Sequence, residues 1–212
     1  VGLLLGALQA LVLVATAQLL PFSIAVLVAL MAGLVLTGAF HEDGLADTAD
    51  GLGGGLSLER KLEIMKDSRV GTYGLVALLS VFLIKWQSLQ ALETEAIWAF
   101  VLVAGLSRAT AVSVTFVLPY QQLDSLSKTK PIATSLQKRA LLWIWLFVVP
   151  LLCFVPLSLA LSLVATLALC FSLLFFYYRS QLQGYTGDLL GAAQQVTELG
   201  LYLVWLIWWR QQ

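Results

Sequence analysis

Residues 3–40 of the 212-residue chain read LLLGALQALVLVATAQLLPFSIAVLVALMAGLVLTGAF and contain no Asp, Glu, Lys or Arg. A helix that spans a bilayer needs about 20 mostly apolar residues, and this stretch holds two such runs, 3–20 and 22–40, separated at Pro21. Further apolar runs follow at 72–92, 96–118, 140–156, 158–178 and, shorter, 196–209. The sequence therefore predicts an all-α, polytopic transmembrane bundle of about six to seven spans, forming a single integral membrane domain over 1–212.

The composition of the chain agrees with a bilayer environment. Hydrophobic residues make up 60% of the sequence and charged residues 11%, against about 25% charged in an ordinary soluble domain. Acidic and basic residues balance, and no basic stripe with interleaved aromatic residues occurs, so we expect the lipid bilayer and no nucleic acid as a partner. The sequence leaves open whether the chain forms a homo-oligomer.

The basic residues outside the apolar runs predict the orientation of the bundle. They concentrate in three long connections, whereas the short turns between paired spans carry none. Cytoplasmic loops of membrane proteins are enriched in Lys and Arg. We therefore expect a multi-pass protein of the cell (plasma or inner) membrane whose cytosolic connections are 41–71, 119–139 and 179–195.

The most informative stretch is His41-Glu-Asp-Gly-Leu-Ala-Asp-Thr-Ala-Asp-Gly51. If the preceding helix continues through it, the i, i+4, i+7 spacing places Asp43, Asp47 and Asp50 on one face, and His41 points the other way. A hard divalent cation relieves the repulsion among such carboxylates, which are ligands that Mg²⁺ or Mn²⁺ prefers. The pattern predicts a metal site, with a solvated acidic loop as the alternative.

A short amphipathic cytosolic helix is predicted after Gly53-Gly-Gly55. Ser57 can cap its first turn, and Gly71 can end it. On the membrane surface this helix can hold Glu63 or Asp67 toward the acidic cluster, or it is an ordinary interfacial helix with a solvated acidic face.

Two cations and two acids lie inside or beside the apolar runs. Lys85 and Arg108 are candidates to bind an anionic substrate group, although Lys85 can also snorkel to the interface. Asp188 and Glu198 enter the last span and need partners there. Acids suited to Mg²⁺ together with cations suited to phosphate are typical of phosphoryl-group transfer.

Three stretches carry a resemblance to a known family: His41 to Gly51, then Leu62-Glu-Ile-Met-Lys-Asp-Ser-Arg-Val-Gly71 with Gly74, then Thr186-Gly-Asp-Leu-Leu-Gly-Ala192. They resemble cobalamin synthase, the adenosylcobinamide-GDP ribazoletransferase family. Members usually begin some tens of residues earlier, so the resemblance implies an N-terminally truncated chain. The connection Asp124-Ser-Leu-Ser-Lys-Thr-Lys-Pro131 departs from the family's pattern, although Lys128 and Lys130 keep it basic.

The resemblance implies a magnesium-dependent transfer of adenosylcobinamide phosphate from adenosylcobinamide-GDP to α-ribazole or its 5′-phosphate, with GMP released. Mn²⁺ is a possible substitute for Mg²⁺. The implied metal ligands are Asp43, Asp47, Asp50 and Asp67. The implied catalytic residues are Asp67, Asp43, Glu63 and His41. The implied substrate-binding residues are Lys85, Arg108, Arg69, Lys66, Asp188 and Glu198.

Two alternatives have different chemistry. A CDP-alcohol phosphatidyltransferase carries Asp-x-x-Asp-Gly-x-x-Ala-Arg, and this chain has Gly54-Gly55 where Ala-Arg stands in that motif. An ion-coupled transporter usually places its acids near the bilayer midplane within repeated halves, whereas these acids cluster at one surface and no repeat aligns. The ribazoletransferase hypothesis is favoured over both.

Overall fold

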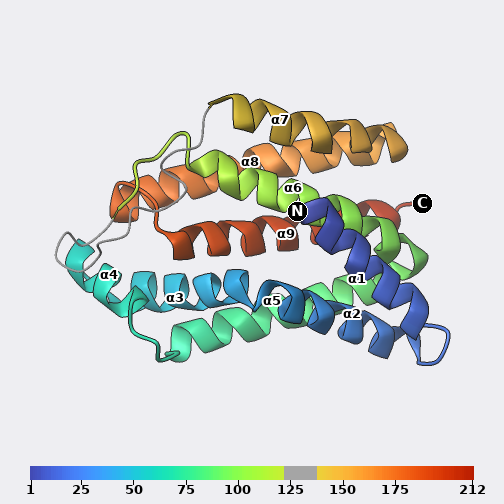
Figure 1. Ribbon diagram of the computed structural model, residues 1–212, viewed down its shortest axis with the longest axis horizontal. Coiled ribbons are helices and arrows are strands. Elements are labelled where there is room, and N and C mark those ends of the chain that lie inside the picture. The colour runs from blue at the N-terminus through green and yellow to red at the C-terminus, as the bar shows by residue number, and fades with distance from the viewer. Residues whose placement is uncertain (122–137) are drawn as a thin grey trace.

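The computed structural model describes residues 1–121 and 138–212, so the basic connection with Lys128 and Lys130 lies outside the described residues. The described part is built from helices (Figure 1), and its only β-type pairing is one bridge between Tyr120 and Tyr185. The helices are α1 (Gly2–Thr16), α2 (Phe22–Thr37), α3 (Phe40–Gly54), α4 (Leu58–Met65), α5 (Thr72–Ala91), α6 (Ala96–Val114), α7 (Lys138–Val148), α8 (Leu157–Leu182) and α9 (Gly187–Trp209), with 3₁₀ turns Glu93–Glu95 and Val149–Phe154. The all-α prediction is confirmed.

Three helical stretches of the described residues are long and apolar enough to cross a membrane: α5, Glu93–Val114 and α8. The pair α2 and α3 passes the same test as a fourth, broken span, and α1 and Arg139–Phe154 are apolar but shorter. The number of candidate spans is therefore lower than the six to seven predicted. Run 3–20, for example, forms a helix of only 15 residues, whereas run 158–178 lies in one of 26.

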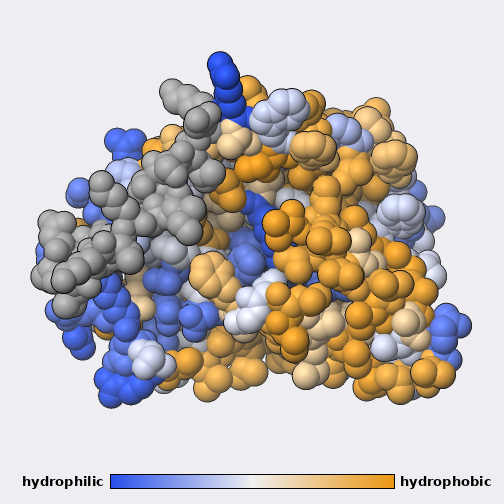
Figure 2. Space-filling model, in the orientation of Figure 1, coloured by the Kyte–Doolittle hydropathy of each residue, from blue (hydrophilic) through white to orange (hydrophobic). Residues whose placement is uncertain are grey.

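The outer surface identifies a membrane protein. Large apolar side chains such as Leu79, Leu161 and Leu173 are more than half exposed, although water would penalise such exposure. Figure 2 shows hydrophilic residues gathered toward the end of the molecule that carries α4, and hydrophobic residues over most of the rest of this face.

A sharp bend separates α2 from α3. The spacing of the acids was interpreted for the case that the preceding helix continues through them, but α2 ends at Thr37 and α3 starts at Phe40 at an angle of 86°. Gly38 and Ala39 both have positive φ, 63° and 55°, a left-handed conformation that ends a helix and that glycine tolerates best. The acids therefore keep their helical register but lie on a separate helix.

The third predicted connection, 179–195, is corrected. Helix α8 continues to Leu182 and α9 begins at Gly187, where the Thr186 hydroxyl accepts a hydrogen bond from the Leu189 N–H at 3.2 Å. The polar residues of this stretch, among them Gln194 and Gln195, are buried because α9 packs against α3, α5, α6 and α8. Hydropathy alone does not show that neighbouring helices cover them.

The closest approach of two helices near the acidic stretch is between α3 and α9. A Cβ atom added at Gly44 would lie 2.7 Å from the Asp188 carbonyl oxygen, and one at Gly191 would lie 3.1 Å from the His41 carbonyl oxygen. Small residues permit such backbone contact between helices in membranes. This crossing brings the start of α9, with Asp188, beside the acids of α3.

Candidate active site

Three carboxylates gather where α3 crosses α9. The charges of Asp43, Asp188 and Asp50 repel that of Asp47, and Asp43 also repels Asp188. Asp43 is exposed, and Asp47 and Asp188 are half-buried. Among the described residues, none of Asp43, Asp47 and Asp188 takes part in an ion pair. We call Asp43, Asp47 and Asp188 the acidic cluster.

Asp50 has a different environment from the acidic cluster. Its carboxylate is buried and accepts hydrogen bonds from the backbone N–H groups of Gly71 at 2.7 Å and Gly74 at 2.9 Å. Both donors belong to the first turn of α5, whose N–H groups have no partner within the helix. Asp50 is therefore a cap for α5 supplied from another helix, a role that its spacing in the sequence did not indicate. Gly71, expected to end the preceding helix, instead starts α5.

This cap predicts a stability effect. In Asp50→Ala, two N–H groups at the start of α5 lose their acceptor, so we expect a loss of about 1–3 kcal/mol in the free energy of unfolding. Asp43→Ala on the same helix removes an exposed carboxylate that repels its neighbours and is the matched control, with no loss expected. Chemical unfolding of both variants in detergent measures the difference, and equal stability would contradict the capping role.

The amphipathic helix forms as predicted, as α4. The Ser57 hydroxyl accepts a hydrogen bond from the Arg60 N–H at 3.2 Å, and Leu62 and Met65 are buried. However, Glu63 forms an exposed ion pair with Arg60 at 3.1 Å, so it does not face the acidic cluster.

The segment after α4 holds Asp67, Arg69 and Lys66. The Arg69 guanidinium donates hydrogen bonds to Asp67 at 3.0 Å and lowers the pKa of that carboxyl to about 2. A carboxylate with so low a pKa is a weak base. Lys66 and Arg69 are exposed cations near the polar end of the molecule, and the structure does not join Asp67 to the acidic cluster.

Deeper in the bundle, Lys85 and Glu198 form a buried ion pair between α5 and α9. Each residue is less than a tenth exposed, and the Lys85 ammonium also donates to Gln195 Oε1 at 2.6 Å. The expectation that Glu198 needs a partner is thereby met. Neither alternative for Lys85 describes what is found, because its charge neither snorkels to the interface nor stays free for an anion.

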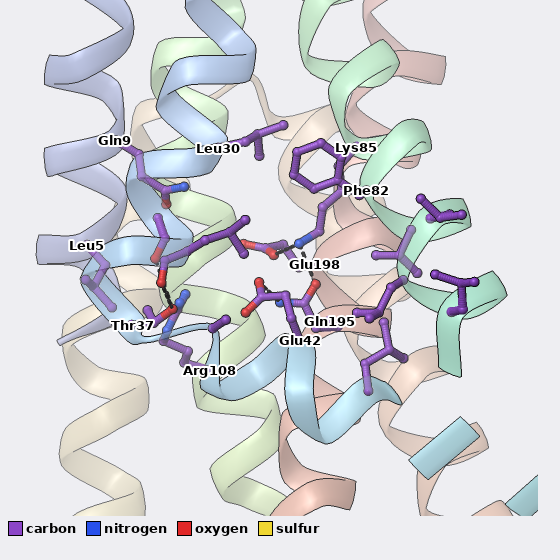
Figure 3. Close-up of a pocket in the computed structure, with 18 residues that line it drawn as sticks. Leu5, Gln9, Leu30, Thr37, Glu42, Phe82, Lys85, Arg108, Gln195 and Glu198 are labelled. Carbon is purple, nitrogen blue, oxygen red and sulfur yellow. Dashed lines mark hydrogen bonds and ion pairs between the residues drawn. The ribbon is translucent and has the colours of Figure 1, made fainter. Parts of the chain in front are cut away.

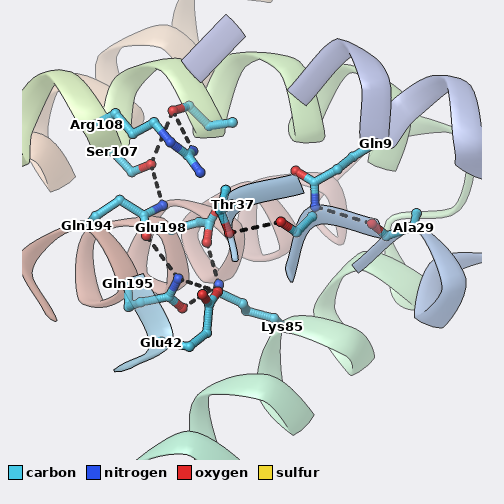
Figure 4. Close-up of polar contacts among 12 residues, drawn as sticks. Gln9, Ala29, Thr37, Glu42, Lys85, Ser107, Arg108, Gln194, Gln195 and Glu198 are labelled. Atoms are coloured by element: carbon cyan, nitrogen blue, oxygen red, sulfur yellow. Dashed lines mark hydrogen bonds and ion pairs between the residues drawn. The ribbon is translucent and has the colours of Figure 1, made fainter. Parts of the chain in front are cut away.

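The ion pair belongs to a larger polar network, shown in Figure 4. The Gln195 amide donates to Glu42 Oε1 at 2.8 Å and to Gln194 Oε1 at 2.9 Å, and the Gln194 amide donates to Ser107 Oγ at 3.2 Å. The network joins α3, α5, α6 and α9. Sequence analysis missed Glu42, Gln194 and Gln195, although Glu42 precedes Asp43 in the most informative stretch.

Arg108 stands apart from these closed contacts. Its Nη1 donates to the carbonyl of Ala104 in its own helix at 3.1 Å, whereas its buried Nε atom has no partner among the described residues. The same holds for the buried Oε2 atom of Glu42. Both side chains line a cavity of about 340 Å³ between α1, α2, α3 and α5, drawn in Figure 3.

His41 lies away from the acidic cluster, as the helical register predicts. It lines a second cavity of about 980 Å³ that is shared with Arg108, Trp143 and Gln194. Arg108 therefore borders both cavities, and His41 is placed beside a cation.

The acidic cluster has the chemistry of a magnesium site but not a complete set of ligands. Among residues 1–121 and 138–212, no three His, Cys, Asp or Glu side chains converge closely enough to hold one metal ion. Mg²⁺ is commonly held by one or two carboxylates, several waters and the phosphates of its substrate. Carboxylates without an ion-pair partner among the described residues, as at the α3–α9 crossing, fit that mode of binding.

The family model described as "Cobalamin-5-phosphate synthase" matches residues 1–206. The chain is similar to the adenosylcobinamide-GDP ribazoletransferase of Shewanella frigidimarina, with 49% identity over 208 residues, 96% of this chain and 80% of that protein. The protein of the same name from Shewanella amazonensis is 46% identical over 216 residues, 100% of this chain and 83% of the relative. No solved structure matches the chain.

Proposed function

The chain belongs to the cobalamin-5-phosphate synthase family, and on that premise we propose that it is an adenosylcobinamide-GDP ribazoletransferase. It transfers adenosylcobinamide phosphate from adenosylcobinamide-GDP to α-ribazole or its 5′-phosphate, giving adenosylcobalamin or its 5′-phosphate and GMP. The observation that carries the proposal is the similarity to relatives of that name, at 46–49% identity over 96–100% of this chain. The same similarity favours this activity over a lipid transferase or a transporter.

The reaction exchanges one phosphorus–oxygen bond for another. A ribose hydroxyl oxygen of α-ribazole attacks the phosphorus that carries the adenosylcobinamide group, and the bond from this phosphorus to the bridging oxygen of the diphosphate breaks. GMP leaves with the bridging oxygen, and the hydroxyl proton passes to a base. The protein's task is to place the hydroxyl in line with the leaving group and to balance charge on the phosphates.

We propose that the acidic cluster binds the metal ion of the reaction, Mg²⁺ or in its place Mn²⁺. Its mutually repelling carboxylates at the crossing of α3 and α9, which have no ion-pair partner within 1–121 and 138–212, support this assignment. Bound there, the ion supplies charge neutralisation for the diphosphate oxygens and the leaving GMP. Asp43, the most exposed member of the cluster, is the candidate to accept the hydroxyl proton, because Arg69 keeps Asp67 a weak base.

Two pairs of charged residues outside the acidic cluster have different roles in this proposal. Lys66 and Arg69, exposed after α4, are candidates to hold the GMP part of the substrate at the polar end. Lys85 and Glu198 pair with each other and thereby fix α5 against α9. The proposed orientation is a multi-pass protein of the inner membrane with the acidic cluster on the cytosolic side, where GDP-linked substrates occur. It is supported by the hydrophilic end seen in Figure 2 and by the positions of the basic residues.

Release of GMP by the detergent-purified protein tests the proposal. With adenosylcobinamide-GDP, α-ribazole and Mg²⁺, we expect GMP to form, and we expect none when α-ribazole is omitted or EDTA is added. Release of CMP from CDP-linked alcohols, without GMP release from adenosylcobinamide-GDP, would instead assign the protein to the lipid transferases.

A further inference from the structure

The cavity of about 340 Å³ between α1, α2, α3 and α5 has an apolar body and a polar inner end. Its apolar lining follows α5 from Leu75 to Phe82, and Lys85 lies at the inner end of that face. The ten residue steps of helix from Leu75 to Lys85 cover about 15 Å. We call this cavity the α5 slot. Its volume is at the lower end of the range of about 300–1,000 Å³ in which small-molecule sites fall.

The polar end of the slot is electrically balanced but incompletely hydrogen-bonded. The charges of Lys85 and Arg108 are offset by those of Glu198 and Glu42, so a further anion gains no net attraction there. The buried Arg108 Nε donor and Glu42 Oε2 acceptor nevertheless lack partners among the described residues. Leaving buried polar groups unpaired is costly. A neutral ligand that offers one acceptor and one donor satisfies both atoms.

These features select among the molecules of the reaction. A lipid chain fills the apolar body but leaves both polar atoms unpaired, and a phosphate meets two carboxylates. A corrin ring with its amide side chains is far larger than the slot. A neutral nucleoside with an apolar fused-ring base fits: its methylated ring lies among the leucines and Phe82, a ring nitrogen accepts from Arg108, and a ribose hydroxyl donates to Glu42. The Arg guanidinium also favours aromatic faces.

The slot and the acidic cluster share helix α3. Glu42, which lines the slot, and Asp43, which belongs to the cluster, are consecutive residues of α3. A nucleoside whose ribose lies at Glu42 is therefore held against the helix that also carries carboxylates proposed to serve the phosphoryl transfer. Figure 3 shows Glu42 and Arg108 reaching into the slot from different helices.

We propose that the α5 slot binds α-ribazole, the acceptor substrate, through its dimethylbenzimidazole base before the metal and the GDP-linked substrate are present. The proposal rests on the proposed function for the identity of the nucleoside. It assigns Arg108 and Glu42 to the recognition of the nucleoside.

Binding of labelled α-ribazole, measured by equilibrium dialysis of the detergent-purified protein in EDTA, tests the assignment. Leu78 lines the slot from α5, so Leu78→Trp fills it, whereas Leu83→Trp on the same helix adds an indole on an exposed face that lines none of the cavities described above. We expect saturable binding to wild type and to Leu83→Trp, and affinity at least about tenfold weaker in Leu78→Trp. In turnover, the KM for α-ribazole should rise in Leu78→Trp while the KM for adenosylcobinamide-GDP stays unchanged.

Three outcomes overturn the inference: wild-type affinity in Leu78→Trp, a raised KM for adenosylcobinamide-GDP alone, or loss of a co-purified lipid from Leu78→Trp with α-ribazole binding intact. If Leu78→Trp does not fold, Phe82→Ala removes an aromatic contact from the slot and is expected to weaken binding in the same assay. Failure of the proposed function has a different signature, because wild-type protein then releases no GMP. Ribazole-dependent GMP release with an unchanged KM in Leu78→Trp refutes the slot assignment alone.

Discussion

Asp47→Asn is expected to lower the rate of ribazole-dependent GMP release by about 10²–10³-fold, the effect of losing one group that stabilises transition-state charge. The charges of Asp43, Asp188 and Asp50 all act on Asp47, and the substitution removes this carboxylate of the acidic cluster while keeping the shape of the side chain. Rates measured over a range of Mg²⁺ concentrations should show that excess metal restores little of the activity.

Stability measurements on the same variant separate a metal site from a structural role. Because the carboxylates around Asp47 repel it, the neutral amide should leave the Tm in EDTA unchanged or higher. A ligand that binds only the folded state raises the Tm, so Mg²⁺ should stabilise wild type and have little effect on Asp47→Asn. Glu59→Gln, an exposed acid of α4, is the control and should behave as wild type. Near-normal activity in Asp47→Asn would refute the proposed metal site.

Lys85→Ala and Glu198→Ala should each lower the free energy of unfolding by about 3–5 kcal/mol, since either change leaves an unpaired charge in the bundle interior. Both residues are less than a tenth exposed, so neither charge is solvated by bulk water once its partner is removed. Replacement of both, as Lys85→Met with Glu198→Leu, removes the two charges together and should cost much less than the sum of the single changes.

Unfolding by SDS of protein reconstituted in bicelles measures these differences. Lys61→Met is the matched control. The half-buried Lys61 ammonium donates a hydrogen bond to Gln181 at 2.8 Å and forms no ion pair with the described residues. Loss of this hydrogen bond should cost under about 1 kcal/mol in the free energy of unfolding. Single substitutions at Lys85 and Glu198 that cost no more than Lys61→Met would show that the ion pair does not hold α5 to α9.

Local signals in the sequence were strong enough to predict several elements. The charge-free stretch 3–40 and the other apolar runs predicted a helical membrane protein, and Ser57 with the spacing of Leu62 and Met65 predicted α4. The spacing of Asp43 and Asp47 placed both on one face of a helix. The capping and the helix faces depend on residues within one or two helical turns. The membrane location depends on the total apolar surface that is removed from water. Neither prediction requires knowledge of contacts between residues far apart in the sequence.

Which polar groups meet was decided by the tertiary structure. The left-handed residues Gly38 and Ala39 turn α3 away from α2, and the glycines at Gly44 and Gly191 let α9 come close enough to add Asp188 to the cluster. Asp50 accepts a hydrogen bond from Gly74, 24 residues away in the sequence, at the start of α5. Lys85 pairs with Glu198, which is 113 residues away. The sequence by itself determined that this protein is helical and lies in a bilayer. Only the packing of the helices decided which residues its buried polar groups contact. Each buried polar group needs a hydrogen bond or a counter-charge, and the neighbouring helices supply it.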